Sequence, residues 1–437
     1  MNIQIPPAVL TLLDRLRTAG FAAYAVGGCV RDSLLGKTPA DWDVTTEALP
    51  EQIKAALPDY RILETGIRHG TVTVLTAEEA VEVTTYRCES SYSDGRRPDA
   101  VRFVRELRED LRRRDFTVNA MAWHPAEGLI DPFGGQEDLR ARIIRCVGRP
   151  EKRFSEDSLR ILRALRFSAV LAFNIEAETA EALHLCAPLL TRIAPERISA
   201  ELLRLLCGER VLPVMRDFRE ILGKAIPALL PMFDLDQRNP YHIHDVYLHT
   251  LHVVEAVPAE PVLRLAALFH DCGKPSCRTV DDNGIGHFYR HAAVGADIAE
   301  QAMRELRLDS DTIRQVKQLV KWHDVPLEPT RSCIRRWLNR LGEPALRRLL
   351  LLKRADTLGQ APTLFERQKE IDRLEAMLQQ VLAESLCFSL KDLAVKGSDL
   401  IAIGVPIGPM VGELLNRLLT EVIDCLLYTS PSPRDLS

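Results

Sequence analysis

The chain has 437 residues, of which 46% are hydrophobic and 27% are charged, and its net charge at pH 7 is −4. This length predicts two to four domains, and the composition excludes a disordered or fibrous chain. No apolar run approaches the roughly 20 residues of a membrane span, so we expect no membrane association. The opening MNIQIPPAVL lacks the pattern of a signal peptide. Ten scattered cysteines without a C-x-x-C pair favour reduced thiols in a cytoplasmic protein.

Periodicity and turn residues predict a mixed sheet at the front of the chain and helices behind it. Residues 5–20 form the first expected helix, which ends at Gly20. Strands and short helices then alternate in FAAYAVGG, VRDSLLG, DWDVTTEA and EQIKAALP. TVTVLT and AVEVTTYR alternate with a period of two, which predicts paired strands. From about residue 105 helices dominate, so the expected fold class is α+β followed by an all-α part.

Local charge departs from the near-neutral average in two segments. Residues 96–114 hold eight arginines against four acids, and residues 140–166 hold eight arginines and one lysine against three acids. Basic patches on a near-neutral protein favour a polyanion that is bound at one place.

Three acids and a glycine turn form the first candidate site. The segment GGCVRD, residues 27–32, follows a strand and opens a helix, where backbone N–H groups can approach an anion and Arg31 can reach a phosphate. Asp41 and Asp43 begin the next strand, and alternation aims both carboxylates at one face, where a divalent cation would relieve their repulsion. Glu82 lies in the middle of AVEVTTYR and would join them from an adjacent strand. Each motif alone is more often an ordinary turn or a surface acid, but together they predict a two-metal phosphoryl-transfer site.

The segment RRRDFTVNAMA, residues 112–122, adds donors and acceptors just before an apolar run. Arg114 supplies a donor fork, Asp115 an acceptor and Asn119 an amide. A helix start with Asp115 as its cap explains the same residues equally well.

Six segments, in this order, resemble the class II tRNA nucleotidyltransferases, which are the CCA-adding enzymes and their bacterial poly(A) polymerase relatives. The segments are GGCVRDSLLG, DWDVTT, VEVTTYR, RRRDFTVNAMA, DPFGGQEDL and SEDSLRILRALRF. RIAPERISAELLRLL is similar to the family's next motif, and VKGSDLIAIGVPIGPMVGELLNRLL is similar to its tail. The resemblance runs without a gap from about residue 20 to 210 and implies a nucleotidyltransferase head, followed by a helical neck, body and tail.

The resemblance also implies roles for individual residues. Gly28 and Arg31 would hold the triphosphate, and Arg114 would hold the incoming nucleotide. Asp41 and Asp43 would bind Mg²⁺ ions. The implied substrates are tRNA, CTP and ATP.

The helix SEDSLRILRALRF, residues 155–167, is expected to select the nucleobase. Its row of one acid and three guanidinium groups consists of Asp157, Arg160, Arg163 and Arg166. Cytosine and adenine each present an amino donor beside a ring-nitrogen acceptor, which matches an accepting Asp157 beside a donating Arg160. Guanine and uracil present the reverse, and the unpaired groups would cost about 1–3 kcal/mol each. Arg163 and Arg166 would hold the triphosphate or fix Asp157. In isolation, such a pair is usually surface helix support.

A second cluster combines histidines and aspartates in helical patterns. They are His249 in LHTLHVVE, His270 and Asp271 in LFHDCGKP, His291 in FYRHAAVGA, and His323 and Asp324 in VKWHD. Such side chains from several helices are ligands for a divalent metal that activates water. The stretch resembles the HD superfamily of metal-dependent phosphohydrolases, which implies phosphatase and phosphodiesterase activity on nucleotides, with a metal of unknown identity. His242, His244, His252 and His287 are expected to be bystanders.

Four alternatives remain open at this stage. The chain is a CCA-adding enzyme, or an A-adding enzyme or poly(A) polymerase, or an HD phosphohydrolase with a degenerate head, or a pure RNA-binding module. The presence of all three head acids disfavours the third, and the clustered acids disfavour the fourth. Oligomeric state is left open.

The expected organisation follows from these motifs. The head spans 1–145, the neck 146–230, the HD-type helical domain 231–345 and a tRNA-binding helical tail 346–424. The last segment, 425–437, reads as translated adaptor or vector sequence and is expected to be non-native. Candidate RNA contacts are the basic residues near 140–153, and Arg335, Arg336 and Arg340, for which a solvated helix face is the simpler interpretation.

Overall fold

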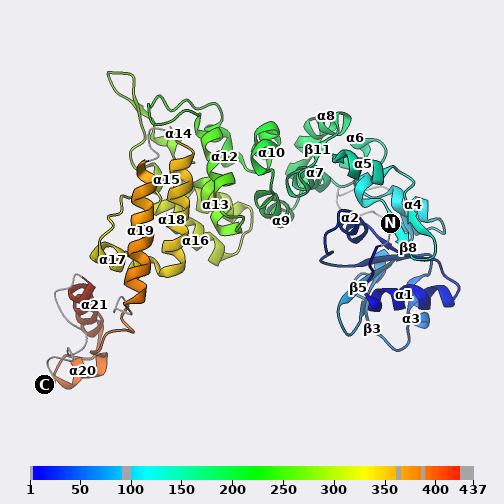
Figure 1. The fold of residues 1–437 in the computed structure, drawn as a ribbon, viewed down its shortest axis with the longest axis horizontal. Helices are drawn as coiled ribbons and strands as arrows, with labels where there is room; N and C mark the ends of the chain where they lie inside the picture. The colour runs from blue at the N-terminus through cyan, green and yellow to red at the C-terminus, as the bar shows by residue number, and fades with distance from the viewer. Residues whose placement is uncertain (1–2, 91–99, 361–365, 385–388, 424–437) are drawn as a thin grey trace. The chain divides into compact units, whose positions relative to one another are not determined.

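The structure, a computed structural model, describes residues 3–90, 100–360, 366–384 and 389–423. The segment 425–437, interpreted above as non-native, lies outside the described residues. The chain divides into two compact units, Met1–Ala225 and Ile226–Ser437, whose elements Figure 1 labels. No helix in the described part is long and apolar enough to cross a membrane.

A seven-stranded mixed sheet forms the centre of the first unit. In spatial order its strands are β3 (Arg61–Leu63), β4 (Thr71–Leu75), β5 (Ala80–Thr85), β2 (Asp43–Thr46), β1 (Ala23–Val26), β8 (Ala122–His124) and β9 (Gly128–Ile130). Neighbouring strands are antiparallel except β2 and β5, which run parallel. The strands predicted from FAAYAVGG, DWDVTTEA, TVTVLT and AVEVTTYR are therefore confirmed as β1, β2, β4 and β5. The period of two appears as burial of alternate residues, with Val72, Val74, Val81 and Val83 in the core.

Short helices cover this sheet and connect its strands. They are α1 (Pro7–Thr18), α2 (Gly28–Leu34), α3 (Pro50–Ala56), α4 (Leu107–Arg112), α5 (Gly135–Ala141) and the 3₁₀ turns η1 (Ile67–His69) and η2 (Thr117–Asn119). Figure 1 shows α1 and α3 on one side of the sheet and α2 on the other. A separate hairpin pairs β6 (Arg87–Ser90) with β7 (Ala100–Phe103). The helix predicted over 5–20 corresponds to α1.

The rest of the first unit is helical, as predicted. Its helices are α6 (Pro150–Glu156), α7 (Leu159–Leu171), α8 (Ala177–Cys186), α9 (Pro195–Leu206), α10 (Val211–Asp217) and α11 (Arg219–Ala225), with the 3₁₀ turn η3 (Ala187–Arg192). A short parallel pair, β10 (Ile143–Ile144) and β11 (Asn174–Ile175), joins the end of the head to the turn after α7. Helix α7 is nearly all buried and packs on α9, so it is the core helix of this region.

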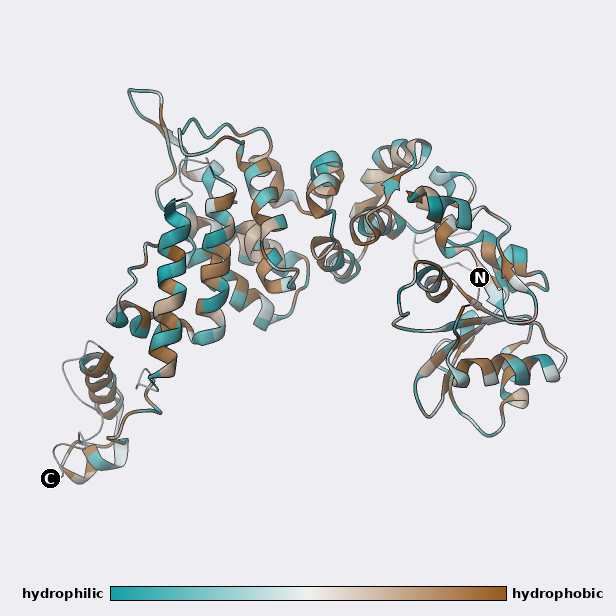
Figure 2. Ribbon diagram, in the orientation of Figure 1, coloured by the Kyte–Doolittle hydropathy of each residue, from teal (hydrophilic) through white to brown (hydrophobic). Residues whose placement is uncertain are grey.

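The second unit is built from helices with one short hairpin. Its elements are η4 (Pro227–Met232), α12 (Val246–Ala256), α13 (Pro261–Phe269), α14 (Lys274–Cys277), β12 (Thr279–Val280), β13 (Gly286–His287), α15 (His291–Glu305), α16 (Ser310–Trp322), α17 (Arg331–Leu341), α18 (Glu343–Leu358), α19 (Glu366–Ala383), α20 (Gly397–Ala402) and α21 (Pro409–Ile423). Helices α12, α13, α15, α16 and α18 contact one another and enclose a common interior. Figure 2 shows hydrophobic and hydrophilic stretches on different sides of these helices, as expected for amphipathic helices that share a core.

Candidate functional site

The parallel pairing of β2 with β5 brings two of the three head acids together. Asp43 at the start of β2 lies directly opposite Glu82 of β5, and residues opposite each other in adjacent strands project from the same face. Asp41 precedes the strand in an exposed bend. Burial, together with the charges of Asp41 and Glu82, raises the pKa of Asp43 to about 6 against the opposing charge of Arg114. A cation bound next to β2 and β5 would relieve the repulsion among the three carboxylates.

Arg114 lies against the glycine turn that precedes α2. Gly27 has φ +85° and ψ −128°, which a side chain rarely permits, and a β-carbon there would lie 2.7 Å from Nη1 of Arg114. The other side of this guanidinium faces Asp110, with Nη2 3.9 Å from Oδ2. Because Gly27 has no side chain, the guanidinium of Arg114 can lie between this turn and the carboxylate of Asp110.

Arg31 of α2 belongs to a chain of hydrogen bonds that reaches the neck. Its guanidinium donates to both oxygens of Asp32 at 2.8 and 2.9 Å and to Oδ1 of Asn119 at 2.6 Å. Asn119 donates in turn to Oδ1 of Asp115 at 3.0 Å, and Arg163 of α7 donates to Oδ2 of Asp115 at 2.8 and 2.5 Å. Asp115 is thus a buried junction, and not the side-chain cap of a helix.

The row of side chains predicted on one helix is interrupted at its first member. Helix α6 ends at Glu156, Asp157 is extended (φ −136°, ψ 102°), and α7 begins at Leu159. Oδ1 of Asp157 accepts the N–H of Leu159 at 3.1 Å, a local bond that competes with helical backbone geometry. The expectation that residues 155–167 form one continuous helix is therefore wrong.

Each charged member of the row has its own partner. Asp157 pairs with Arg197 of α9 at 2.9 Å, Arg160 with Glu156 at 3.0 Å, and Arg166 with Glu201 of α9 at 2.6 Å. Arg160 also donates to the backbone carbonyls of Arg153 and Arg113. Arg163 is held by Asp115, so Arg197 and not Arg163 or Arg166 fixes Asp157. Arg197 lies in the segment RIAPERISAELLRLL, but it was not among the residues predicted for the site.

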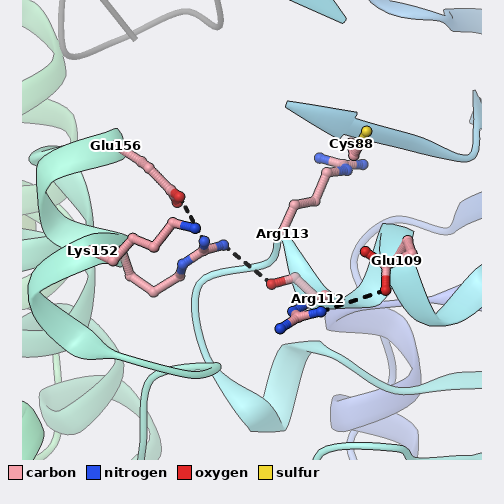
Figure 3. A pocket seen from close by; sticks show the side chains of 7 residues that line it. Cys88, Glu109, Arg112, Arg113, Lys152 and Glu156 are labelled. Atoms are coloured by element: carbon pink, nitrogen blue, oxygen red, sulfur yellow. Dashed lines mark hydrogen bonds and ion pairs between the residues drawn. The ribbon is translucent and has the colours of Figure 1, made fainter. Parts of the chain in front are cut away.

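A basic pocket of about 330 Å³ lies where α4 and β6 face α6 (Figure 3). Cys88, Glu109, Arg112, Arg113, Lys152, Arg153 and Glu156 line it. Arg153 donates to Glu156 at 2.6 Å and to the carbonyl of Arg112 at 3.1 Å, which joins its two walls. Lys152 and Arg112 are exposed, so the pocket presents positive charge to solvent. Of the three arginines predicted as RNA contacts in the second unit, Arg335 is buried, whereas Arg336 and Arg340 are exposed, and Arg340 also lies over the rings of Trp322 and Trp337.

The histidine and aspartate cluster of the second unit is brought together in two groups that share Asp271. His249, His270 and Asp271 form one group, and Asp271, His291 and His323 form the other. His270 Nε2 lies 3.1 Å from Oδ2 of Asp271, while His291 Nε2 lies 3.5 Å from Oδ1. All five residues are buried.

The tautomers of the four histidines fit a bound metal. Each Nδ1 lies 2.7–3.0 Å from a backbone carbonyl, which can only accept a hydrogen bond, so Nδ1 carries the proton and Nε2 keeps its lone pair. The carbonyls are those of Gly359, Ala267, Phe288 and Val320. The Nε2 atoms of His249 and His270 are then 3.4 Å apart, and those of His291 and His323 are 3.2 Å apart. In this arrangement the Nε2 lone pairs of two neutral imidazoles face each other. A cation between the two nitrogens would be a ligand partner for both lone pairs.

Two further side chains complete this cluster. Oδ1 of Asp356, from α18, lies 3.0 Å from Nε2 of His249, and Nζ of Lys274 lies 2.7 Å from Oδ2 of Asp271. Neither Asp356 nor Lys274 was predicted for this site, although Lys274 belongs to the segment HDCGKP. Asp324 was predicted as a ligand, but it is exposed at the pocket rim and belongs to neither ligand group found among the described residues.

The fold and the two clusters define a two-part protein, with a nucleotidyltransferase head and an HD-type helical unit, and comparison with known proteins agrees. Residues 23–145 match the family described as "Poly A polymerase head domain", residues 172–230 match "Probable RNA and SrmB- binding site of polymerase A", and residues 241–359 match "HD domain".

Two similar proteins match nearly the whole chain, and a third matches about half of it. A CCA-adding enzyme of Limosilactobacillus reuteri is 33% identical over 97% of this chain and 95% of its own length. One from Leuconostoc mesenteroides is 52% identical, but over only 46% of this chain and 49% of its own length. The crystal structure of the Bacillus stearothermophilus CCA-adding enzyme in complex with CTP covers 98% of this chain and 95% of its own, at 31% identity and a TM-score of 0.72. The chain belongs to the family of CCA-adding enzymes, which are tRNA nucleotidyltransferases.

Replacing Gly27 with alanine is expected to impair nucleotide incorporation, because the new β-carbon collides with the Arg114 guanidinium. We expect kcat/KM for incorporation to fall about tenfold or more. Gly36→Ala is the matched control, since Gly36 also has a positive φ (+72°) but has open space around its Cβ position. Equal activities of the two variants would show that the approach of Arg114 to Gly27 has no role in the reaction.

Proposed function

We propose that this chain adds C and A residues to the 3′ ends of tRNA, using CTP and ATP, in a nucleotidyl transfer assisted by two Mg²⁺ ions. The observation that carries the proposal is the in-register placement of Asp43 and Glu82 on parallel strands, with Asp41 and Arg114 close enough to shift the pKa of Asp43. The relationship to CCA-adding enzymes over the whole chain supports the same reaction.

Each head residue has a chemical role in this reaction. Asp41, Asp43 and Glu82 would hold the cations, which supply charge stabilisation at the phosphoryl group and lower the pKa of the attacking 3′-hydroxyl. Arg114 binds the incoming nucleotide beside them. Arg31 and Gly28 bind the triphosphate at the turn before α2, with Arg31 oriented by Asp32 and Asn119. The 3′-hydroxyl oxygen attacks the α-phosphorus, and pyrophosphate leaves.

Asp157 and Arg160 select the base. The residues flank the break between α6 and α7, and each is held by a counter-ion, Arg197 for Asp157 and Glu156 for Arg160. An acceptor and a donor that are fixed in this way resist the rearrangement that guanine or uracil would require. Arg163 orients Asp115, and Arg166 orients Glu201. These two arginines therefore stabilise the surroundings of Asp157 and Arg160.

RNA phosphates would bind at the pocket of Figure 3. Arg112 and Lys152 face solvent there, and positive charge at exposed positions contributes to RNA binding through counterion release. The part of the tail that follows α18, whose Asp356 belongs to the histidine and aspartate cluster, would contact the tRNA further from its 3′ end.

Incorporation of single nucleotides distinguishes the polymerase alternatives. A tRNA that ends before CCA is incubated with CTP or ATP alone and then with both. A CCA-adding enzyme extends it with CTP alone and completes it with both, whereas an A-adding enzyme or poly(A) polymerase does not use CTP. Extension by UTP or GTP would contradict the proposed base selection.

Replacing Asp157 with alanine should reduce the preference for CTP and ATP more than it reduces metal binding, because the acceptor that recognises the amino groups is lost. Relative kcat/KM values for the four nucleotides measure the preference, and Mg²⁺ titration of activity measures the metal requirement. A variant that rejects UTP and GTP as well as the parent protein does would refute this account of α6 and α7.

We further propose that the histidine and aspartate cluster is a phosphohydrolase site for divalent cations, in which Asp271 would contribute a ligand to each of the two groups. One cation would be bound by His249, His270, Asp271 and Asp356, and the other by Asp271, His291 and His323. Cations held there would supply charge stabilisation and lower the pKa of the attacking water in the hydrolysis of a phosphate ester to phosphate and alcohol. Lys274 neutralises Asp271 and faces the same pocket.

Exchange of single acids should separate the two activities. Asp43→Asn is expected to abolish nucleotide incorporation and to leave phosphoester hydrolysis unchanged, while Asp271→Asn should do the opposite. Both assays use the same full-length protein. Loss of both activities in either variant would mean that the two sites do not work independently.

The number of tightly bound ions tests whether both ligand groups that share Asp271 bind a cation. After removal of metal with a chelator, reloading with Mn²⁺ and gel filtration, Asp271→Ala should retain two fewer ions per chain than the parent protein, and His291→Ala should retain one fewer. His244→Ala is the control, since His244 stacks on His252 outside the cluster. If Asp271→Ala and His291→Ala each lose the same single ion, the cluster holds one cation only.

A further inference from the structure

An aromatic wall stands beside the buried ligands of the second unit. A pocket of about 290 Å³ opens onto Asp271, His291 and Asp356, and residues 286–290 form one side of it. The proposed metal ligands form the floor of this pocket. The proposed hydrolysis does not account for the wall.

The backbone of this wall is fixed before any ligand binds. The N–H of Gly286 donates to the carbonyl of Arg238 at 2.8 Å, and Asn239 donates to the carbonyl of Gly286 at 3.3 Å. A β-carbon at Gly286 would lie 2.2 Å from the carbonyl oxygen of Gln237, so only glycine allows this contact. His287 is anchored through Nε2 to Asp281 at 2.9 Å. The wall is therefore pre-organised.

The wall presents a stacked pair of rings. His287 and Tyr289 lie parallel, with centroids 5.4 Å apart and an angle of 6° between their planes. Tyr289 is nevertheless 72% exposed, which is unusual for a large aromatic side chain. Its exposed ring lines the pocket and is available to stack on a planar ligand.

Positive charge lies next to the rings. Arg290 is exposed and lines the pocket, and its backbone is left-handed (φ 66°) immediately before the ligand His291. Such a conformation is uncommon for arginine and is often found at functional sites. Lys274 lies over the ring of Phe288, 5.4 Å from its centroid, and reaches the floor at Asp271. A ligand that suits this pocket is planar at one end and anionic at the other.

We infer that Tyr289, backed by His287, is a platform for the nucleobase of a nucleotide whose phosphate lies on the floor of the pocket, with Arg290 beside that phosphate. The inference rests on the proposed phosphohydrolase function and names the side chain that recognises the base of its nucleotide substrate. Nucleoside monophosphates and cyclic phosphates satisfy both ends of the pocket. Inorganic pyrophosphate and sugar phosphates satisfy only one.

Hydrolysis by the full-length, Mn²⁺-loaded protein tests the platform. The probes are 2′,3′-cyclic AMP and glycerol 2-phosphate, which has no base. Base stacking on an aromatic ring predicts that Tyr289→Ala raises KM for the cyclic nucleotide about 5- to 100-fold, with glycerol 2-phosphate and the bound metal unaffected. Tyr289→Trp should restore the lower KM. Equal loss for both substrates, or no loss for either, would overturn the inference.

Binding tests the platform separately from hydrolysis. If the parent protein hydrolyses neither probe, the phosphohydrolase proposal fails, and photo-crosslinking with 8-azido-AMP still reports where the base lies. The inference predicts a labelled peptide that contains residues 287–290, with labelling suppressed by AMP and not by glycerol 2-phosphate. A peptide from the head would be distinguishable by its sequence. Absence of label at 287–290 would overturn the platform irrespective of catalysis.

Discussion

The ion pair between the buried Asp115 and the half-buried Arg163 connects the head to the helices behind it. Burial alone would raise the pKa of Asp115, but the charge of Arg163, the hydrogen bond from Asn119 and the charge of Arg160 outweigh it, so that the pKa falls below its usual range. Asn119 passes the connection on to Arg31. Removing Arg163 would leave the carboxylate of Asp115 buried without its strongest opposing charge. Helix α2, through Arg31 and Asn119, and helix α7, through Arg163, are therefore held by the same carboxylate.

The sequence predicted those parts of the head that depend on local pattern. Alternation of valines predicted β4 and β5, and the position of Glu82 within that alternation placed it on the exposed face beside Asp43. The break at Asp157 could not be predicted in this way, because residues 155–158 are all polar and apolar periodicity does not show whether they continue a helix or interrupt it. A side-chain bond from Asp157 to the N–H of Leu159 and a partner on α9 decide the local conformation, and the second of these depends on tertiary packing.

The ligands of the second cluster show the same limit. His249, His270, Asp271, His291 and His323 were predicted from their residue types within helical segments, and all five converge. Asp356 was missed because it lies in the leucine-rich helix α18, and only the packing of α18 against α12 brings it to His249. Asp324 was included because it follows a histidine, as Asp271 does. Neighbouring residues at a helix end point in different directions, however, and Asp324 reaches only the rim.

The two clusters make different demands on the cations that fit them. Asp41 and Glu82 are exposed beside the interior strands β2 and β5, so a cation bound there would keep contact with water and would be well suited to arrive and leave with a nucleotide. The second cluster is lined by buried imidazoles whose tautomers are fixed by backbone carbonyls, and rigid nitrogen ligands of this kind suit a resident transition metal. Under the proposed function, oxygen ligands at the head and nitrogen ligands in the helical unit would let one chain use a hard, exchangeable ion for synthesis and a more tightly bound ion for hydrolysis. Because the donor sets differ, neither site has to compete with the other for its metal.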